Sequence, residues 1–451
     1  MAAPVVTTRI LRRLLSSGVH ARAERLLARV HPADLGPLLS GLTPDETRLV
    51  IEMLFRQRRA ASTLRELPPE LLPQIYEAVS DERIAAVLAR LEVDDLVDLV
   101  DSIPEERRAG VAANLPDTTR EELRRAELYP PGSAGHFMTT SYLGLDEKMS
   151  AQEAIDSIRG AAGEPSESIL YLYVIDDVRR LLGVVPIRRL VAAPSSTPVS
   201  ELMIRDPVRT HLDADQEEVA QLVARYDLLA IPVCDVDGTM MGVITVDDVI
   251  DVITEEATED MYHLAGLSDE ERIFTSATLS IRKRFPWMLV NLVAISLAAA
   301  IVGLFGQTLE RVIALAAFLP VVAGMGGNSG IQSLTIVTRA IALGEIEFST
   351  GLRAVGKEFL VSLTIGAATG GLAGAAAWLW QGSAYLGVVL FTSLVATMAV
   401  AGSLGAAVPL ALKALRQDPA LGSGVIVTTL TDAFGFLTFL GIATLMLDQL
   451  A

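Results

Sequence analysis

The sequence predicts a multidomain α plus α/β membrane protein. It would contain an N-terminal helical superhelix, a tandem α/β pair, an acidic connecting helix and a membrane domain of five α-helical spans. Hydrophobic residues make up 51% of the 451-residue chain, which is too apolar for one ordinary soluble domain. The region before Phe285 carries a net charge of −17 out of the total of −18. The middle of the chain contains a duplicated strand and helix pattern.

Residues 1–134 read as short helices throughout. Leucines recur at spacings of three and four in 33–42, 83–91 and 94–103, and acidic residues open the segments at 44–46, 80–83 and 104–107. We therefore predict a cytoplasmic domain of stacked helices that forms a superhelical array. Such arrays usually bind another molecule, and the alternative is a plain helical domain without a ligand.

Residues 135–252 alternate between helices and β-strands in two halves, about 135–200 and 201–252. Strands are predicted at 169–177 and 181–187, and the segment 228–246 repeats this pair with a hairpin turn at Asp237-Gly238. Gly183 and Gly242 occupy corresponding positions in the two halves. The duplicated pattern resembles a tandem pair of CBS domains, which often sense nucleotides or ions.

Adenosine-binding halves of CBS modules typically carry the pattern G-x-x-[ST]-x-x-[DN]. The second half keeps it as Gly242, Thr245 and Asp248, so the resemblance implies that Thr245 and Asp248 contact a nucleotide and that ATP is a modulator. In the first half Pro186 and Arg189 break the pattern, which argues against a nucleotide there. A purely structural CBS pair is the alternative.

An acidic tract leads from this region toward the membrane, and we assign residues 253–284 to a connecting helix. Seven carboxylates and no basic residue lie between Asp247 and Asp260. On a helix, four of them would share one face at i, i+4 spacing, where like charges are destabilising. Oxygen ligands without sulfur suit a hard cation such as Mg²⁺ or Ca²⁺. A solvated acidic helix is the alternative.

Five membrane spans are expected in residues 285–451, at about 285–306, 311–341, 353–380, 384–412 and 422–447. The distribution of basic residues places the N-terminal domains in the cytoplasm and the C-terminus outside. Gly366, Gly370 and Gly374 have the four-residue spacing of close helix contacts. A single cysteine, Cys234, and no cleavable signal pattern fit a chain whose soluble part faces a reducing cytoplasm.

Asp432 is the one ionisable residue in the apolar run from Gly424 to Leu445. Placing a carboxylate at this depth costs about 2.5–3.5 kcal/mol, so we expect it to face a partner, a water-filled cavity or a passing cation. The alternative is a structural aspartate satisfied by a neighbouring helix.

The second span contains four glycines between Gly324 and Gly330, which predicts irregular backbone. The freed carbonyls of this segment, with Asn328 and Gln332, are expected to contact a hydrated ion. A kinked packing helix is the alternative.

The order of these parts, with the motifs GMGGNSGIQS (324–333), TVDDVIDVITEEATED (245–260) and QDPALGSGVIVTTLTDAFG (417–435), resembles the MgtE family of magnesium channels. The resemblance implies a homodimer that passes Mg²⁺ into the cytoplasm without ATP hydrolysis, in the plasma (inner) membrane of a prokaryote. It implies no enzymatic activity, and it identifies Asp432 as the pore carboxylate.

The same resemblance implies that cytoplasmic Mg²⁺ closes the pore by binding to a set of sensing carboxylates. They are Asp94 and Asp98 in the helical domain, Glu217 and Asp227 in the second CBS half, Asp248, Asp251, Glu256, Glu259 and Asp260 on the connecting helix, and Asp418 before span five.

Rival functions are disfavoured by specific residues. An anion carrier would need basic residues inside the spans, whereas those present lie near span ends, and a membrane protease would need an H-E-x-x-H motif that the five histidines do not form. The acidic surface disfavours nucleic acid. A non-transporting ion sensor leaves Asp432 without a purpose. A transporter of broader selectivity, for Mn²⁺, Co²⁺ or Ca²⁺, remains the alternative to a magnesium channel.

Overall fold

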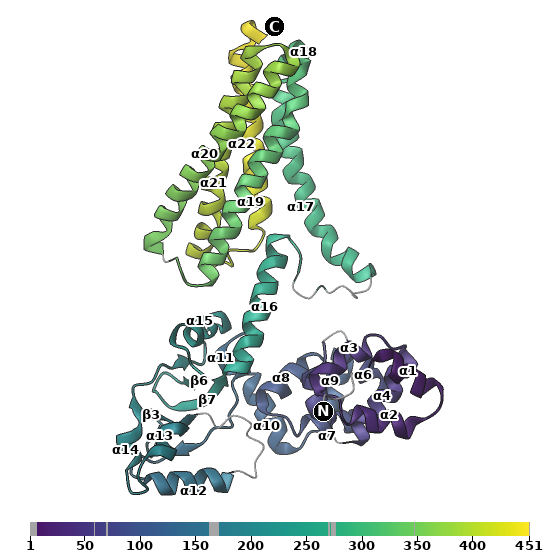
Figure 1. Cartoon of the computed structure of the whole chain (residues 1–451), viewed down its shortest axis with the longest axis vertical. Coiled ribbons are helices and arrows are strands. Elements are labelled where there is room, and N and C mark those ends of the chain that lie inside the picture. Colours follow the sequence, from purple (N-terminus) through teal and green to yellow (C-terminus); the bar gives the residue numbers. More distant parts are fainter. Residues whose placement is uncertain are drawn as a thin grey trace. The chain divides into compact units, whose positions relative to one another are not determined.

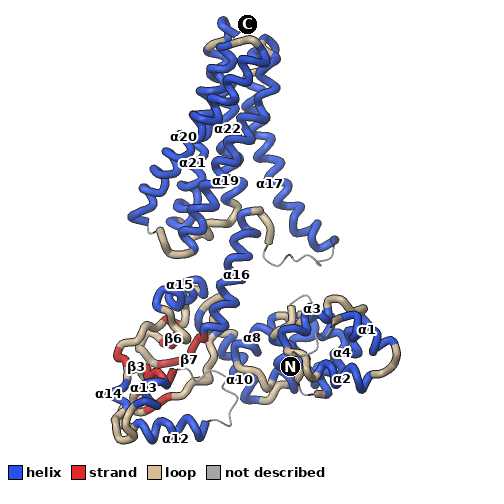
Figure 2. The backbone as a smooth tube through the Cα atoms, viewed as in Figure 1, coloured by secondary structure: helices blue, strands red, loops and turns tan. Residues whose placement is uncertain are grey.

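The computed structural model describes residues 7–57, 59–68, 71–161, 171–268, 271, 277–346 and 348–450. The chain divides into two compact units, Met1–Ile253 and Thr254–Ala451 (Figure 1). The first unit holds the short helices and the strands, and the second holds the long helices (Figure 2). Each unit is described separately below.

The first part of unit one consists of short helices, which confirms the predicted helical superhelix (Figure 2). The start of helix α4 is stabilised by a capping box, in which Thr43 before the helix and Glu46 in its first turn bond reciprocally to each other's backbone. Leucines from successive helices build one continuous core, in which the buried hydroxyl of Tyr76 donates to the carbonyl of Leu99 at 3.0 Å. The helices are α1 (Thr8–Ser16), α2 (His20–Leu27), η1 (Pro32–Asp34), α3 (Leu35–Leu39), α4 (Pro44–Arg56), α5 (Ala60–Arg65), α6 (Leu72–Ala78), α7 (Asp81–Leu88), α8 (Val93–Asp101), α9 (Glu105–Asn114) and α10 (Asp117–Ala126).

The second part of unit one contains two related sheets, of order β1-β2-β3-β4 and β5-β6-β7. Each is built on an antiparallel hairpin, β2 with β3 and β6 with β7, and in each a parallel strand joins the first member of the hairpin. Gly238 has a φ of +83°, as the predicted hairpin turn requires. The strands are β1 (Gly144–Leu145), β2 (Tyr171–Ile175), β3 (Leu181–Pro186), β4 (Ile204–Arg205), β5 (Thr210–His211), β6 (Ala230–Cys234) and β7 (Met240–Thr245). Residues 169 and 170 of the first expected strand lie outside the described residues.

Close approach of a neighbouring segment explains the corresponding glycines of the two halves. A Cβ at Gly183 would lie 2.7 Å from the carbonyl oxygen of Ile204, and one at Gly242 would lie 2.7 Å from that of Thr139. The helices around the sheets are α11 (Ala134–Phe137), α12 (Ala151–Ala161), α13 (Ile187–Ala192), α14 (Val199–Leu202) and α15 (Gln216–Tyr226).

The acidic helix has different bounds from those expected. The helix α16 (Val246–Leu264) starts directly after β7 and ends before Gly266, which has a φ of +69° and so provides a left-handed helix stop. The next helix, α17 (Ala277–Leu304), begins before the predicted start of the first span. Residues 269–270 and 272–276 of the expected connecting segment lie outside the described residues.

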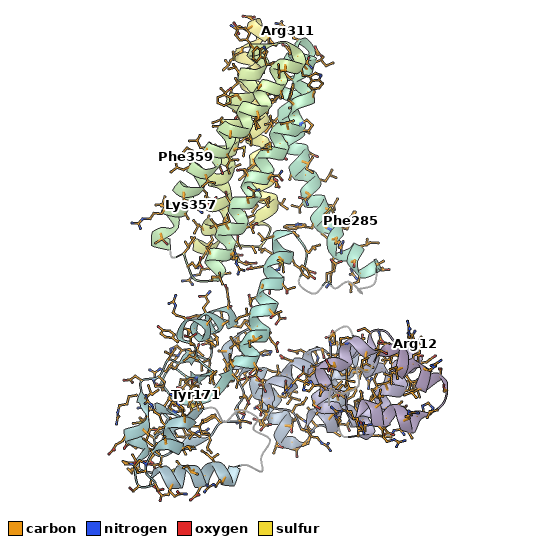
Figure 3. The ribbon with its side chains drawn as sticks, viewed as in Figure 1. Arg12, Tyr171, Phe285, Arg311, Lys357 and Phe359 are labelled. Carbon is orange, nitrogen blue, oxygen red and sulfur yellow. The ribbon has the colours of Figure 1, made fainter. Side chains whose placement is uncertain are left out.

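The part of the second unit that the structure describes contains five helices that are long and apolar enough to span a membrane, which confirms the number predicted. They are α17, α19 (Leu319–Ala342, preceded by the 3₁₀ helix η3, Ile313–Phe318), α20 (Phe348–Gln381), α21 (Ala384–Ala414) and α22 (Ser423–Leu445), with the short helices α18 (Gly306–Arg311) and α23 (Leu447–Leu450) at one end. Lys357 and Phe359 project outward from α20 (Figure 3).

The expectation of irregular backbone in the glycine-rich segment was wrong. The helix α19 runs unbroken from Leu319 to Ala342, so the carbonyls of 324–330 are engaged in its own hydrogen bonds. The glycines serve close packing instead, because a Cβ at Gly326 would lie 2.8 Å from Thr397 and one at Gly330 would lie 2.7 Å from Val427. Without water to compete for backbone groups, a glycine-rich helix keeps its hydrogen bonds and gains contact area.

The predicted glycine contacts of the third span are present. A Cβ at Gly374 would lie 2.6 Å from the carbonyl oxygen of Gly387, and Gly366 and Gly370 likewise face α21.

We predict that Gly374→Val destabilises the membrane unit by about 1–3 kcal/mol, because the added methyls overpack the contact between α20 and α21. Gly371→Val is the matched control, since a Cβ at Gly371 meets no atom within 4 Å. Equal melting temperatures for the two variants in detergent would contradict this account.

Candidate functional site

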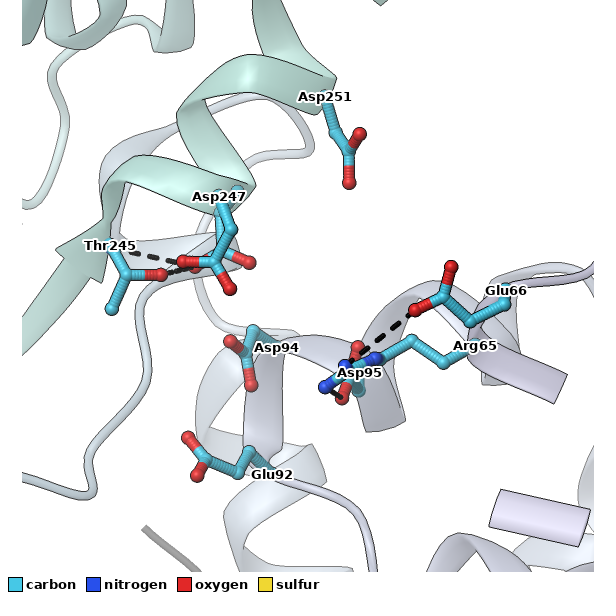
Figure 4. Close-up of a pocket in the computed structure, with 9 residues that line it drawn as sticks. Arg65, Glu66, Glu92, Asp94, Asp95, Thr245, Asp247 and Asp251 are labelled. Carbon is cyan, nitrogen blue, oxygen red and sulfur yellow. Dashed lines mark hydrogen bonds and ion pairs between the residues drawn. The ribbon is translucent and has the colours of Figure 1, made fainter. Parts of the chain in front are cut away.

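An acidic cavity of about 150 Å³ lies within the first unit (Figure 4). Seven carboxylates and a single guanidinium surround it, together with one threonine hydroxyl. The lining residues are Arg65, Glu66, Glu92, Asp94, Asp95, Thr245, Asp247, Asp248 and Asp251. We call this the acidic cavity.

Two helix N-termini place most of these carboxylates. Asp94 and Asp95 lie in the first turn of α8, and Asp247 and Asp248 lie in the first turn of α16. A helix N-terminus favours nearby negative charge, which partly offsets the mutual repulsion. The threonine hydroxyl of Thr245, the last residue of β7, donates to Asp248 Oδ2 at 2.6 Å and fixes that carboxylate.

Asp94 is the carboxyl group most perturbed by this arrangement. Burial and the charges of Asp248 and Asp95 raise its pKa to about 8. Its Oδ1 atom is buried and has no hydrogen-bond partner among the described residues. A buried acceptor without a donor is costly, so the site favours a ligand that supplies positive charge or hydrogen-bond donors, such as a hydrated cation.

The neighbouring carboxyl groups are perturbed in the same direction. Burial raises the pKa of Asp95 to about 6 although the Arg65 guanidinium, 3.5 Å from Asp95 Oδ2, opposes the shift. Burial also raises the pKa of Asp248, and burial with the charges of Glu66 and Asp247 raises that of Asp251. One guanidinium does not neutralise seven carboxylates.

Thr245 and Asp248, the predicted nucleotide contacts, therefore lie in strongly negative surroundings. The nearby Asp94 and Asp247 carboxylates would repel an anionic phosphate. The cavity as it stands suits a cation.

A second acidic group lies in the second unit, at the end of α16. The Nδ1 atom of His263 is 2.7 Å from Asp418 Oδ2 and 3.7 Å from Glu259 Oε1. Burial, with the charges of Asp418 and Glu256, raises the pKa of Asp260 to about 6, while His263 opposes this shift. Asp260 and Asp418 are thus close enough to interact electrostatically. Within the described residues, however, no group of three or more His, Cys, Asp or Glu side chains is arranged to hold a bare metal ion.

Other predicted sensing residues lie apart from the acidic cavity. Asp98 is exposed on α8 and does not line it. Glu217 lies in the first turn of α15 and Asp227 follows its last turn, in the left-handed conformation, so roughly 15 Å of helix separates them. Glu256 and Glu259 lie on the C-terminal half of α16.

The predicted pore residues are on two neighbouring helices. Asp432 is partly exposed on α22, directly after the buried Thr431, and Asn328 is exposed on α19. The Cβ positions of Gly326 and Gly330 on α19 fall within 4 Å of Thr431, so the glycine face of α19 packs next to Asp432. No hydrogen-bond donor to the Asp432 carboxylate is found in the part of the chain that the structure describes.

Sequence reasoning missed several members of these groups. Arg65 and Glu66 lie at the end of α5, and Glu92 and Asp95 lie at the start of α8. Both segments are far from α16 in the sequence, so no spacing rule links them to the acidic tract. A signal did exist for His263, which follows Glu259 by one helical turn.

Three family models match separate parts of the chain. Residues 30–132 match the family model of the MgtE intracellular N domain, residues 199–255 that of the CBS domain, and residues 319–442 that of a divalent cation transporter. The chain is 37% identical over 322 residues to the magnesium transporter MgtE of Bacillus subtilis, covering 71% of each chain.

Two solved structures resemble the soluble part. The cytosolic domain of the Mg²⁺ channel MgtE in complex with ATP is 33% identical, with a TM-score of 0.51, and the match covers 54% of this chain and 99% of that one. The soluble part of a magnesium transporter is 26% identical, with a TM-score of 0.51, and the match covers 55% of this chain and 98% of that one.

A sequence match along nearly the whole chain is with the magnesium transporter MgtE of Thermus thermophilus, which is 34% identical over 443 residues. It covers 97% of this chain and 98% of that one, so it includes the helical part, the CBS pair and all five candidate spans. The chain described here therefore belongs to the MgtE family of magnesium transporters and carries its CBS regulatory domain.

Proposed function

We propose that this chain forms a homodimeric channel that imports Mg²⁺ into the cytoplasm and is closed by cytoplasmic Mg²⁺. The acidic cavity carries the proposal, because seven carboxylates converge there with one guanidinium. Repulsion between them opposes the contact of α8 with α16 unless a cation is bound. A divalent cation that binds the assembled cavity better than the separated parts shifts the equilibrium toward the assembled state.

The pore is proposed to run past Asp432, with Asn328 on the facing helix. Mg²⁺ holds its waters tightly, so a carboxylate and an amide would bind the hydrated ion through hydrogen bonds. A second protomer would supply a second Asp432 and close the wall around the ion. In this orientation the N-terminal domains are cytoplasmic and the C-terminus is outside.

The link from sensor to pore is proposed to run through α16. Its last residue, Leu264, lies against the start of α22, where a Cβ at Gly424 would be 2.6 Å from the Leu264 carbonyl oxygen. Asp260, with Asp418 and Glu259, would bind a further Mg²⁺ at this junction. Asp98, Glu217, Asp227 and Glu256 are proposed as outlying ligands that bind through water or across the dimer.

ATP remains a proposed modulator of the channel. The support is that a relative's cytosolic domain forms a complex with ATP. In this chain Thr245 and Asp248 would meet a phosphate only after the cavity charge had been neutralised by a cation.

Asp432→Asn is expected to reduce Mg²⁺ uptake into reconstituted liposomes to below about a tenth of the wild-type rate, because the neutral amide attracts a hydrated cation far less. Asp448→Asn removes the same charge at an exposed position outside the spans and should leave uptake unchanged. Uptake measured with Mn²⁺, Co²⁺ and Ca²⁺ in parallel tests the alternative of broader selectivity. Normal flux through Asp432→Asn would exclude the proposed pore.

Neutralising Asp94, Asp248 and Asp251 together to Asn should leave the channel conducting at internal Mg²⁺ that shuts the wild type. Without these charges the cavity no longer gains binding energy by assembling around the ion. The control replaces three exposed aspartates outside the cavity, Asp34, Asp45 and Asp237, by Asn. If the first variant closes at the same Mg²⁺ level as this control, the cavity is not the sensor.

Asp94→Asn should raise the melting temperature of the Mg²⁺-free protein at pH 8 by several degrees. The pKa of Asp94 is raised to about 8, so between about pH 4 and 8 the unfolded chain releases a proton that the folded chain retains, and stability falls as pH rises. The advantage of the variant should shrink as pH is lowered toward 4. Saturating Mg²⁺ should reverse the order at pH 8. A variant that is less stable than wild type in chelator would refute the repulsion model.

A further inference from the structure

A second cavity, of about 280 Å³, lies among the helices of the first unit and differs in charge from the acidic cavity. It is formed by the end of α4, the start of α5 and the outer face of α7. None of its lining residues is acidic, and three are arginines. The lining residues are Phe55, Arg56, Ala60, Ala61, Arg83, Ala86, Val87 and Arg90. We call this the arginine cavity.

The arginines of this cavity are not neutralised within the part of the chain that the structure describes. Arg83 lies over the ring of Phe55, with its guanidinium carbon 5.3 Å from the ring centroid. The Nε atom of Arg56 donates to the carbonyl oxygen of Glu52 at 3.3 Å. No ion pair with a carboxylate is found for Arg56, Arg83 or Arg90 among the described residues.

Nearby arginines show the opposite behaviour. Arg107 pairs with Asp81, and Arg65 lies 3.5 Å from Asp95. Arg59 donates to the carbonyls of Leu27 and Val30, so its charge is used to join helices. The residues before Gly135 include 18 arginines and 21 acidic residues, so neutralising partners are abundant in this part of the sequence. Other arginines of this region, such as Arg22 and Arg29, likewise have no ion pair among the described residues, so what distinguishes Arg56, Arg83 and Arg90 is that they line one cavity without an acidic residue.

The composition of the cavity defines the ligand chemistry. A guanidinium group can bind a phosphate through two parallel N–H donors. When the plane of the guanidinium is fixed, it binds phosphate more readily than an ammonium group does. The position of Arg83 over the ring of Phe55 fixes its plane in this way. The alanines, Val87 and Phe55 supply the apolar part of the lining. We propose that the arginine cavity binds a small phosphate-bearing anion.

The size of the cavity favours a small ligand over a protein segment. An α-helix is about 10–12 Å across with its side chains, and an acidic helix of a second copy would not enter a hollow of this volume. Two sources share the phosphate chemistry: a soluble polyphosphate or nucleotide, and the headgroup of an anionic lipid.

The test is calorimetric titration of sodium pyrophosphate into the full-length chain in Mg²⁺-free buffer. The variant R56Q/R83Q/R90Q should bind at least about tenfold more weakly than wild type, because it loses three charge-assisted contacts. The control R13Q/R22Q/R29Q removes the same charge from exposed arginines of α1, α2 and the turn that follows, and should bind like wild type. The double variant R56Q/R90Q keeps the contact of Arg83 with Phe55, so weaker binding by this variant would not reflect loss of that contact. It should bind with intermediate affinity.

Two further arms distinguish the sources. In nanodiscs of phosphatidylglycerol, a lipid-headgroup site should bind pyrophosphate less tightly than in nanodiscs of phosphatidylcholine, whereas a site for soluble anions should bind equally in both.

The proposal is overturned if wild type does not bind pyrophosphate, or if the cavity variant and the charge-matched control weaken equally. It is also overturned if the cavity variant changes only the oligomeric state in light scattering, which would indicate an acidic segment of a second copy as the occupant.

Discussion

Repulsion among partly buried carboxylates is the constraint on which the first unit depends. The assembly of α8 against α16 places Asp94, Asp95 and Asp248 around one cavity, with Arg65 as the single cation. Apolar packing elsewhere holds these helices, since Val249 and Val252 of α16 are buried in the core of the second sheet and Leu96 of α8 is buried in the core of the helical part. The electrostatic free energy of the cavity thus depends on the cation that neutralises its carboxylates. The apolar cores on either side do not depend on that cation.

The membrane unit differs from the first unit, because small residues and not charges determine how its helices pack. Gly374 and Gly387 bring two backbones into direct contact, Gly330 leaves room for the Val427 side chain, and some of the remaining polar groups find partners inside the bundle. Glu358, for example, is buried but accepts from Ser333 at 2.8 Å and pairs with Lys357 at 2.9 Å. Asp432 differs from Glu358 because no donor in the described residues satisfies it. That contrast supports a role for Asp432 toward an ion.

Much of the architecture was predictable from local pattern. Leucine spacing identified the short helices, the Asp237-Gly238 turn identified a hairpin, and apolar runs identified five spans. The backbone of α19 was predicted wrongly because glycine was treated as a helix breaker, as it is in water. In water, exposed backbone groups can bond to solvent instead of to the helix, whereas the interior of a bilayer offers no such partner. Glu66, Glu92 and Asp95 were missed because their proximity to Asp248 is tertiary. Asp98 was assigned with Asp94 by resemblance to the family, and it is exposed on α8. The domain limits, the dimer and the individual ion ligands stay predictions.

The continuity of α16 has a mechanical consequence. Its 19 residues form one uninterrupted helix of about 28 Å, with the acidic cavity at its first turns and Leu264 against Gly424 at its end. A Cβ at Gly424 would lie 2.6 Å from the Leu264 carbonyl oxygen, so a larger residue at position 424 would push the end of α16 away from the start of α22. Glycine at position 424 is therefore what allows the end of α16 to lie directly on the start of α22.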